Sequence, residues 1–344
     1  MITTWIEKML ATKNLTPTRE NLDEFVLDRM RYTVSYCAES SNFYRDLLKG
    51  SGIGSITDFK RLPMTCADDI IEKPNYFLCI SQSEILRSYV VDTLDGKSKQ
   101  ISFSLSELEH IVSAIATFFR SIGITGGTKV GILFPPEYEW GIPDLLVRAA
   151  KECGADPGLI DQNDMDSQMS AIESIQPELL VGSAQQLFFL TALREKGAKT
   201  PPYLKGIVPC HGCVPYLFSE KAKRMVKESW GTKLYEHFGI TEMGFNVAMG
   251  CDEGGWLHIN EADVYAETVD PAGAPLGEGE EGELLLTSLS AKSMPIIRYR
   301  TGYLASMAEP GCSCGDSLTR RLKIRSYLGS DEDLLSRPLV FRPF

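Results

Sequence analysis

The sequence predicts an α/β protein, with parallel or mixed sheets flanked by helices and an antiparallel β subdomain towards the C-terminus. From "KVGILF" at residue 129 to "KLYEHFG" at residue 233, strand-like apolar runs alternate with helical segments, the order of a largely parallel sheet. From about residue 255, short segments broken by Pro and Gly replace this alternation, which is typical of antiparallel strands. We therefore expect an α/β core over residues 1–254, a β-rich subdomain over 255–335 and a tail over 336–344.

Composition narrows the class of function. The 344 residues carry a net charge of −11 and no basic stripe, which disfavours nucleic acid as a partner. No apolar run approaches the ~18 residues that a membrane helix needs, and the N-terminus lacks the features of a signal peptide. In such a chain the nine cysteines are expected to be thiols or metal ligands. We expect a cytoplasmic enzyme that acts on a small ligand.

The N-terminal part is predicted to be helical before it forms a hairpin. Apolar residues recur at helical spacing over residues 18–50, and Thr65 is a plausible N-cap for "ADDIIE", with Asp68 three residues on. "EILRSYVVDTLDGKSKQISFS" is typical of two strands joined by a turn around Asp95–Gly96. Ser104 then begins the helix "SLSELEHIVSAIATFFRSIG".

The alternating region follows this helix. Its strands are expected at "KVGILF", "ELLVGS", "LKGIVPC" and "KLYEHFG", and its helices at "GIPDLLVRAAKECGA", "AQQLFFLTALREKG" and "FSEKAKRMVKESW". The segment "WLHINEADVYAETVDPAGAPLGEGEEGELLLTSL" is then expected to form short antiparallel strands.

The segment "KLYEHFGITEMG" carries the strongest chemical pattern. Phe238 beside Gly239 can present a flat face to a base, and the hydroxyl of Thr241 can donate to a phosphate oxygen. Glu242 next to a phosphate would call for a cation, and Mg²⁺ prefers such oxygens. An ordinary strand-to-helix turn with a Thr-Glu cap explains the same residues equally well.

Several segments resemble one known family. "YEHFGITEMG" is similar to the Y-x-x-Y-G-x-T-E core of the adenylate-forming (AMP-binding) superfamily. "GEGEEGELLLTSLSAKSMPIIRYRTGYL", "RMRYTVSYCAESSNFYRDLL" and "FKRLPMTCADDI" resemble motifs of its phenylacetate–CoA ligase-like branch. The similarity runs in order over roughly residues 20 to 335. It implies that a carboxylic acid attacks the α-phosphorus of Mg·ATP, and that a thiol, usually coenzyme A, then captures the acyl group.

The resemblance also implies roles for single residues. Phe238 and Gly239 would face adenine, with Phe238 stacking on it, and the backbone at Gly212 would approach the same base. Thr241 would contact the α-phosphate, and Glu242 would hold Mg²⁺.

The acyl pocket is expected between this segment and "LFPPEYEWGIPDLLVRAA". Pro136, Tyr138 and Trp140 are candidate lining residues. His237 is expected to be a packed histidine beside the turn, and a hydrogen bond to the acyl carboxylate is the alternative.

The phosphate loop departs from the family pattern S-S-G-T-T-G-K-P. Its nucleotide-binding candidates are Thr93, Gly96 and Lys97. Asp92 and Asp95 add negative charge where a triphosphate would bind, and this charge should repel it. Lys97 and Lys99 only partly offset the repulsion.

The loop "PIIRYRTGYLASM" is a second departure. Thr301 and Gly302 keep the turn of the family, but Tyr303 stands where the family has an aspartate that accepts hydrogen bonds from both ribose hydroxyls. A phenol offers one oxygen and cannot make that bidentate contact.

The mobile domain that carries the catalytic lysine in this family is expected to be absent, because the chain ends at Phe344. Either it was lost or the chain is part of a longer one. A separate lysine-bearing domain, a carrier protein or a second copy of the chain in a homodimer are the expected partners.

Four residues predict a structural zinc site. Cys251 and His258 have the spacing C-x6-H, and Cys312 and Cys314 have the spacing C-x-C in a Gly-rich knuckle. Three thiolates and one imidazole suit a closed tetrahedral site. Unrelated free thiols are the alternative, and a rival cluster would be Cys210, His211 and Cys213.

Two hypotheses follow. The first is an acid–thiol (acyl-CoA) ligase-like protein that adenylates a small, conceivably aromatic, carboxylic acid with ATP and Mg²⁺ and uses coenzyme A. The second is a non-catalytic homologue that binds an acyl ligand or a protein partner, because the ATP motifs are altered. A zinc-stabilised scaffold without a small ligand is a third reading.

Overall fold

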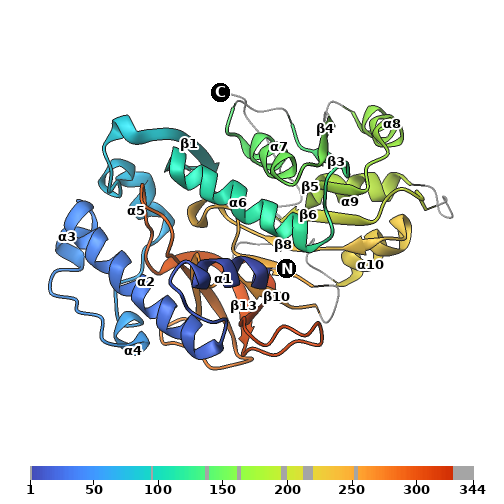
Figure 1. The fold of residues 1–344 in the computed structure, drawn as a ribbon. Coiled ribbons are helices and arrows are strands. Elements are labelled where there is room, and N and C mark those ends of the chain that lie inside the picture. Colours follow the sequence, from blue (N-terminus) through green and yellow to red (C-terminus); the bar gives the residue numbers. More distant parts are fainter. Residues whose placement is uncertain are drawn as a thin grey trace.

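The predicted α/β class is confirmed by a computed structural model, which describes residues 2–93, 96–135, 139–160, 164–194, 200–211, 220–251 and 255–327. Within these residues, one large mixed sheet carries helices on its faces, and a two-stranded sheet stands beside it (Figure 1). The strand order is β11-β12-β13-β14-β10-β9-β8-β6-β5-β3-β4, with β7 beside β6. No described helix is long and apolar enough to cross a bilayer.

The first half of the sheet is parallel, as the alternation predicts. Its strands are β3 (Lys129–Leu133), β4 (Asp156–Ile160), β5 (Leu179–Ser183), β6 (Gly206–His211), β7 (Lys233–Leu234) and β8 (His237–Phe238). Its helices are α6 (Leu105–Ser121), α7 (Ile142–Glu152), α8 (Met165–Ile175), α9 (Ala184–Leu193) and α10 (Glu220–Trp230). Val181 packs into the core that contains α6 and α7, whereas Leu180 packs into a second core with α8, α9 and α10. Helices therefore cover both faces of this half.

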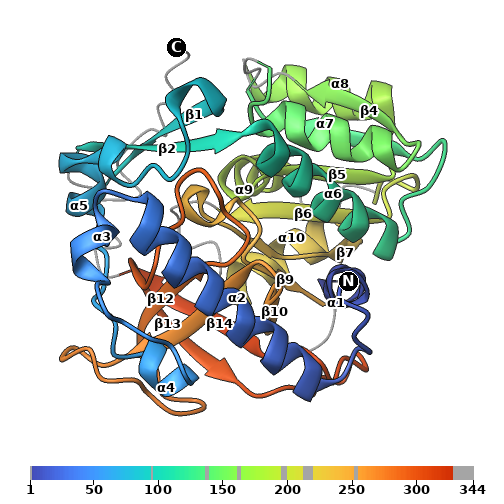
Figure 2. The same cartoon turned by 60° about the vertical axis from the view of Figure 1, so that its left-hand side comes forward.

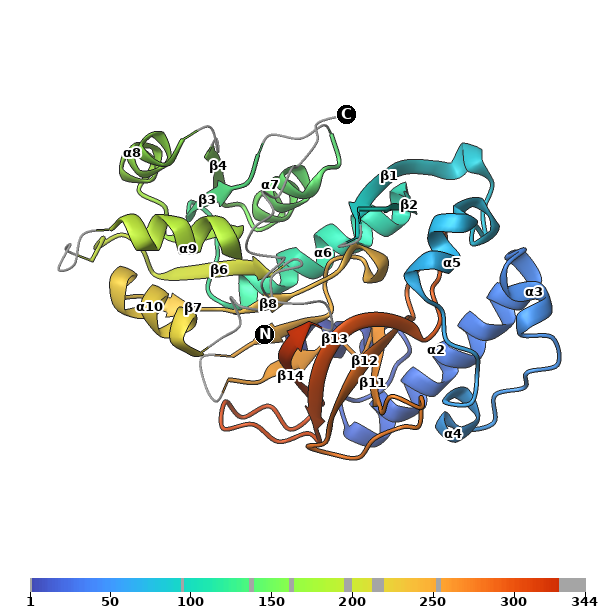
Figure 3. The same cartoon turned by 180° about the vertical axis from the view of Figure 1, so that it is seen from behind.

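The second half of the sheet is antiparallel. Its strands are β9 (Ala248–Gly250), β10 (Leu257–Ile259), β11 (Val264–Val269), β12 (Glu281–Ser288), β13 (Tyr299–Ala308) and β14 (Arg321–Tyr327). The direction changes at β8, which is parallel to β6 but antiparallel to β9. Figure 3 shows α8, α9 and α10 at one end of the molecule, with β11 to β14 between them and the helices at the other end. The predicted boundary at residue 254 falls between β9 and β10, which pair in the same sheet.

The N-terminal helices cover the antiparallel half. They are α1 (Ile2–Ala11), α2 (Arg19–Ser40), α3 (Tyr44–Leu47), α4 (Ile56–Phe59) and α5 (Ala67–Glu72), followed by the short turns η1 (Pro74–Tyr76) and η2 (Gln82–Glu84). Figure 2 shows α2 lying across β12, β13 and β14. Arg19 at the start of α2 forms an ion pair of 2.7 Å with buried Glu261. Such contacts fix the helices on the sheet.

The predicted N-cap Thr65 is wrong by one residue. The cap of α5 is Cys66, whose backbone N–H donates to Asp69 at 2.8 Å. Thr65 is buried, and its hydroxyl bonds to the carbonyl of Ile297 and to the hydroxyl of Tyr44. Its polar group therefore ties the loop to the start of β13 instead of capping the helix.

The predicted hairpin is confirmed. β1 (Ile85–Asp92) and β2 (Ser98–Ser104) pair antiparallel and form the small sheet. Ser104 caps α6, and its backbone N–H and hydroxyl both donate to the Glu107 carboxylate in a capping box. This hairpin lies next to the turn after β8, where the candidate site residues converge.

Candidate functional site

The turn after β8 is tightly packed. A Cβ on Gly239 would lie 1.8 Å from the carbonyl oxygen of Phe245, so only glycine fits there. The short helix η4 (Thr241–Met243) follows, and Gly244 ends it with a φ of +70°. The hydroxyl of Thr241 makes no hydrogen bond with the described part of the chain. The turn therefore presents a free hydroxyl next to a buried carboxylate, that of Glu242.

Glu242 forms a buried ion pair with Lys99. The two side chains are 4% and 9% exposed, and the Lys99 ammonium also donates to the hydroxyl of Tyr299 at 2.7 Å. The pair joins the turn, the hairpin and β13. The sequence interpretation treated Lys99 only as a partial charge offset. In "SKQISFS", Lys99 shares the period of two with Ile101 and Phe103, and this pattern is the sequence signal that could have shown Lys99 to point inwards.

The ion pair with Lys99 bears on the predicted magnesium role of Glu242. The carboxylate already neutralises an ammonium, and among the described residues the cluster of potential metal ligands lies elsewhere in the fold. Mg²⁺ is usually held by one or two carboxylates together with phosphate oxygens. Glu242 as a magnesium ligand therefore stays a prediction, in which phosphate oxygens of a bound nucleotide would supply the other ligands.

The ring of Phe238 is covered by protein. It has no exposed surface, and the ring of Tyr303 packs edge-on against it, with 5.2 Å between the centroids. Tyr303 in turn packs against Tyr327 at 5.0 Å. Tyr303 therefore contributes to the protein environment that buries the Phe238 ring.

The loop before Tyr303 is also fixed by internal contacts. The hydroxyl of Thr301 donates to the carbonyl of Leu284 at 2.7 Å and accepts from the backbone N–H of Tyr303 at 3.1 Å. Gly302 has a φ of +75°, a conformation that favours glycine. Thr301 and Gly302 therefore shape the turn that positions the Tyr303 ring.

The hairpin turn holds the remaining phosphate-loop candidates. The backbone N–H and the hydroxyl of Thr93 both donate to the carbonyl of Lys97, at 2.8 Å and 2.9 Å, and Gly96 has a φ of +82°. The Lys97 ammonium reaches Asp68 at 2.6 Å. Leu94 and Asp95 lie outside the described residues. Thr93 and Gly96 thus close the hairpin, and the Lys97 charge is directed towards α5.

The predicted acyl pocket is described only in part, because Gly212, Pro136 and Tyr138 lie outside the described residues. Trp140 is half-buried, and the guanidinium of Arg148 lies 3.8 Å from its ring centroid. The Trp140 carbonyl accepts a hydrogen bond from Tyr89, whose ring packs against Phe245. Aromatic side chains therefore pack together beside Trp140.

His237 is a neutral hydrogen-bond acceptor. Burial lowers its pKa to about 4, although a hydrogen bond from its ring to the backbone of Phe245 opposes that shift. Its Nδ1 has no partner among the described residues. A bare Nδ1 can accept a hydrogen bond from a ligand but cannot donate one to a carboxylate, which favours the interpretation of His237 as a packed residue.

The four predicted zinc ligands converge. The ligand atoms of Cys251, His258, Cys312 and Cys314 all lie within 4.8 Å of one another. The Sγ atoms of Cys251 and Cys312 are 3.5 Å apart, and Cys314 Sγ lies 3.5 Å from His258 Nε2. In the rival cluster, burial raises the pKa of the Cys210 thiol to about 12. The side chain of His211 and all of Cys213 lie outside the described residues.

His258 is oriented by its other nitrogen. Its Nδ1 lies 2.8 Å from the Asp316 carboxylate and 2.8 Å from the hydroxyl of Thr319. Burial opposes the ionisation of Asp316, but hydrogen bonds from His258, Thr319 and Thr3 hold its pKa well below the ordinary value. The carboxylate fixes the ring so that Nε2 faces the three thiols, an arrangement common at zinc sites.

Comparisons with known proteins agree with this geometry. The phenylacetate-coenzyme A ligase of Thermus thermophilus is 26% identical over 329 residues, and the alignment covers 92% of this chain and 72% of that protein. The Escherichia coli phenylacetate-coenzyme A ligase is 23% identical over 333 residues, covering 92% and 73%. The resemblance to the phenylacetate–CoA ligase-like branch of the adenylate-forming superfamily is confirmed. No family model matches the chain.

The superfamily fold is also shared with solved structures. A 2-hydroxyisobutyryl-CoA ligase in complex with 2-HIB-AMP and CoA superposes with a TM-score of 0.78 at 21% identity, covering 89% of this chain and 68% of that one. The same enzyme in its postadenylation state gives a TM-score of 0.79 over 91% and 69%. The mixed sheet and its flanking helices therefore follow the acyl-CoA ligase fold.

Proposed function

We propose that this chain is an adenylation domain of the acid–thiol ligase type, acting on a small carboxylic acid, with aryl acids as the first candidates. The observation that carries the proposal is the turn Thr241–Glu242 at the carboxyl end of β8, where the sheet changes from parallel to antiparallel. Ligands of open α/β sheets bind at such ends. The relatives are acid–CoA ligases, and one was solved with an acyl adenylate and CoA.

The reaction has two steps. The acid carboxylate forms a bond to the α-phosphorus of ATP, and pyrophosphate leaves. A thiol, with coenzyme A as the proposed acceptor, then attacks the acyl carbonyl, and AMP leaves. In the first step the free hydroxyl of Thr241 would donate to a phosphate oxygen, and the Lys99 ammonium beside Glu242 would place positive charge near it.

The test is ATP–pyrophosphate exchange over a panel of aryl and short acyl acids. Exchange is expected with at least one acid, and Thr241→Ala should reduce it by roughly 10²-fold. Thr12→Ala, in the exposed turn just after α1, is the matched control. No exchange with any acid, or full exchange in Glu242→Ala, would contradict the proposal.

A non-catalytic homologue is the second candidate, and one observation favours it. The ring of Phe238, which is expected to face adenine, packs against Tyr303. The carboxylate of Glu242, which is expected to hold Mg²⁺, forms an ion pair with Lys99. Such a protein would bind an acyl ligand or a protein partner, such as a separate lysine-bearing domain or a carrier protein. Calorimetry with ATP and with AMP separates the two candidates, because only the first predicts heat.

We also propose that Cys251, His258, Cys312 and Cys314 hold a structural zinc ion. Three thiols and one imidazole lie within 4.8 Å of one another, and this is the kind and number of ligands that a closed tetrahedral zinc site takes. Four protein ligands leave no open position, so the ion would fix the knuckle of residues 312–315 to β10 and would not take part in catalysis.

A further inference from the structure

The Lys99 ammonium is held in a fixed place beside the candidate turn. It forms a buried ion pair with Glu242 and donates to the hydroxyl of Tyr299 at 2.7 Å. It also lies 5.2 Å from the centroid of the Tyr299 ring, within the range of a cation–π contact. Because both members of the ion pair are buried, salt in solution screens them only weakly. Lys99 therefore keeps a positive charge next to Glu242.

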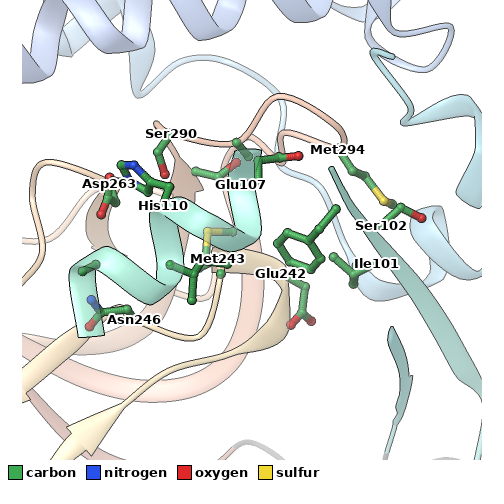
Figure 4. Close-up of a pocket in the computed structure, with 16 residues that line it drawn as sticks. Ile101, Ser102, Glu107, His110, Glu242, Met243, Asn246, Asp263, Ser290 and Met294 are labelled. Carbon is green, nitrogen blue, oxygen red and sulfur yellow. Dashed lines mark hydrogen bonds and ion pairs between the residues drawn. The ribbon is translucent and has the colours of Figure 1, made fainter. Parts of the chain in front are cut away.

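Glu242 is separated from the other ion pair of this region. Figure 4 shows its side chain beside Ile101, on the opposite side of a small cavity from His110 and Asp263. His110 Nε2 lies 2.7 Å from the Asp263 carboxylate, so those two groups bond to each other. The positive charge next to the Glu242 carboxylate is therefore that of Lys99.

A carboxylate at a phosphate site needs a positive charge between the two groups, because their negative charges repel each other. The resemblance implies that Mg²⁺ on Glu242 supplies this charge. In this chain the Lys99 ammonium already supplies it. A metal ion on Glu242 would stand beside that ammonium, and two positive charges in a buried, weakly screened setting repel each other. The local charges thus favour Lys99 over a metal ion.

We propose that the Lys99 ammonium takes the place of the metal ion at Glu242, so that the chain binds the phosphate of AMP or of an acyl adenylate without a divalent cation on that carboxylate. The proposal rests on the proposed function, because it takes the turn Thr241–Glu242 as the phosphate site. It is the alternative to the magnesium role of Glu242. It concerns only this carboxylate, and ATP would still carry Mg²⁺ on its other phosphates.

The test measures the affinity for AMP by calorimetry, once in buffer without divalent cations and once with added MgCl₂. AMP carries only the phosphate that would face Thr241, so metal on the other phosphates of ATP does not affect the result. In the wild type the two Kd values should agree within about twofold. A metal ion held by Glu242 would instead lower the Kd by about tenfold or more when MgCl₂ is added.

Two variants separate the charge of Lys99 from that of a metal ion. Lys99→Met leaves the Glu242 carboxylate unpaired, so without Mg²⁺ it should bind AMP at least about tenfold more weakly than the wild type. Added MgCl₂ should restore much of this loss, because the carboxylate is then free to hold the metal. Lys99→Met/Glu242→Gln has neither charge, and its Kd should not respond to MgCl₂. If Lys99→Met does not fold, the double variant and the wild type still decide the question.

Lys205→Met is the matched control, because Lys205 also pairs with a glutamate, Glu178, but is largely exposed. It should bind AMP as the wild type does in both buffers, and melting curves establish which variants are folded. A wild-type Kd that falls about tenfold or more with MgCl₂, or equal metal responses of wild type and Lys99→Met, would overturn this proposal and leave the proposed function standing. No binding of AMP in either buffer would overturn both.

Discussion

The ring of Tyr303 packs edge-on against that of Phe238, with the two planes at 82° and the centroids 5.2 Å apart. Both rings are buried, so each completes the packing of the other. The contact joins the strand end that should face a base to the loop that should face a ribose. If the chain binds a nucleotide as proposed, this contact lies where the base and the ribose would meet, so it is the place to test that binding.

Replacement of Tyr303 by aspartate should increase the affinity for AMP. The change uncovers a face of Phe238 and supplies two carboxylate oxygens that can accept from ribose hydroxyls. We expect calorimetry to show a Kd lowered by at least about tenfold. Tyr303→Phe keeps the ring and should leave the affinity unchanged. An unaltered Kd in a folded Tyr303→Asp variant would mean that the loop serves something other than a nucleotide.

Loss of Lys99 should destabilise the fold. Lys99→Met leaves the Glu242 carboxylate buried without its cation, and breaking a buried pair in this way costs about 3–5 kcal/mol. The double variant Lys99→Met/Glu242→Gln removes both charges and should recover much of that free energy of unfolding. Urea denaturation of the wild type, both single variants and the double variant measures the coupling. Additive losses would show that the two side chains do not interact.

Much of the fold could be predicted because its signals are local. The strand alternation, the hairpin and the Ser104–Glu107 capping box each lie within a few residues. The helix α1 was not predicted, since its anchors are distant: Trp5 donates to Asp263 and Thr3 donates to Asp316. The strand β4 also escaped prediction. Its segment "DPGLI" contains Pro and Gly, which weaken a strand pattern and which an edge strand tolerates.

Some residues of the candidate site could also be grouped from the sequence, whereas others are brought together only by the fold. The zinc ligands could be grouped because the C-x-C and C-x6-H spacings are short and their residue types are distinctive. The pairing of Lys99 with Glu242 could not be predicted, because 143 positions (242 − 99) separate the two residues in the sequence. Only the packing of β2 against the turn brings them together. The same holds for His110 and Asp263, which come from α6 and from the loop before β11.

Purified protein should contain about one equivalent of zinc. Cys314→Ser should lose the metal and melt at a lower temperature, because a closed zinc site contributes to folding. Asp316→Asn, which removes the charge next to His258 Nδ1 and leaves the four ligands in place, should weaken zinc binding by about 10–100-fold. Metal analysis and melting with and without a chelator measure both effects, and Cys66→Ser, at the N-cap of α5 and outside the cluster, is the control. Less than about half an equivalent in the wild type would exclude a four-ligand site.

The stability of the wild type should fall in acid partly because of His237. Its folded pKa of about 4 is below the ordinary 6.5, so the unfolded chain binds the proton first. Neutral His237 contributes its full share to the free energy of unfolding above pH 6.5. That share, up to about 3 kcal/mol, is lost as the pH falls towards 4. His237→Gln should remove this part of the pH dependence, measured as the free energy of unfolding in urea between pH 4 and 7.

His110 should give the opposite slope, which makes it the control for that measurement. Burial lowers its pKa, but Asp263 raises it more, so the folded value is above 6.5. Its contribution is therefore full below pH 6.5 and is lost as the pH rises through the folded value. His110→Gln should reduce the loss of free energy of unfolding as the pH rises above 6.5. It should leave the loss between pH 6.5 and 4 unchanged. If His237→Gln and wild type lost stability in parallel between pH 6.5 and 4, the buried neutral ring of His237 would not be the cause.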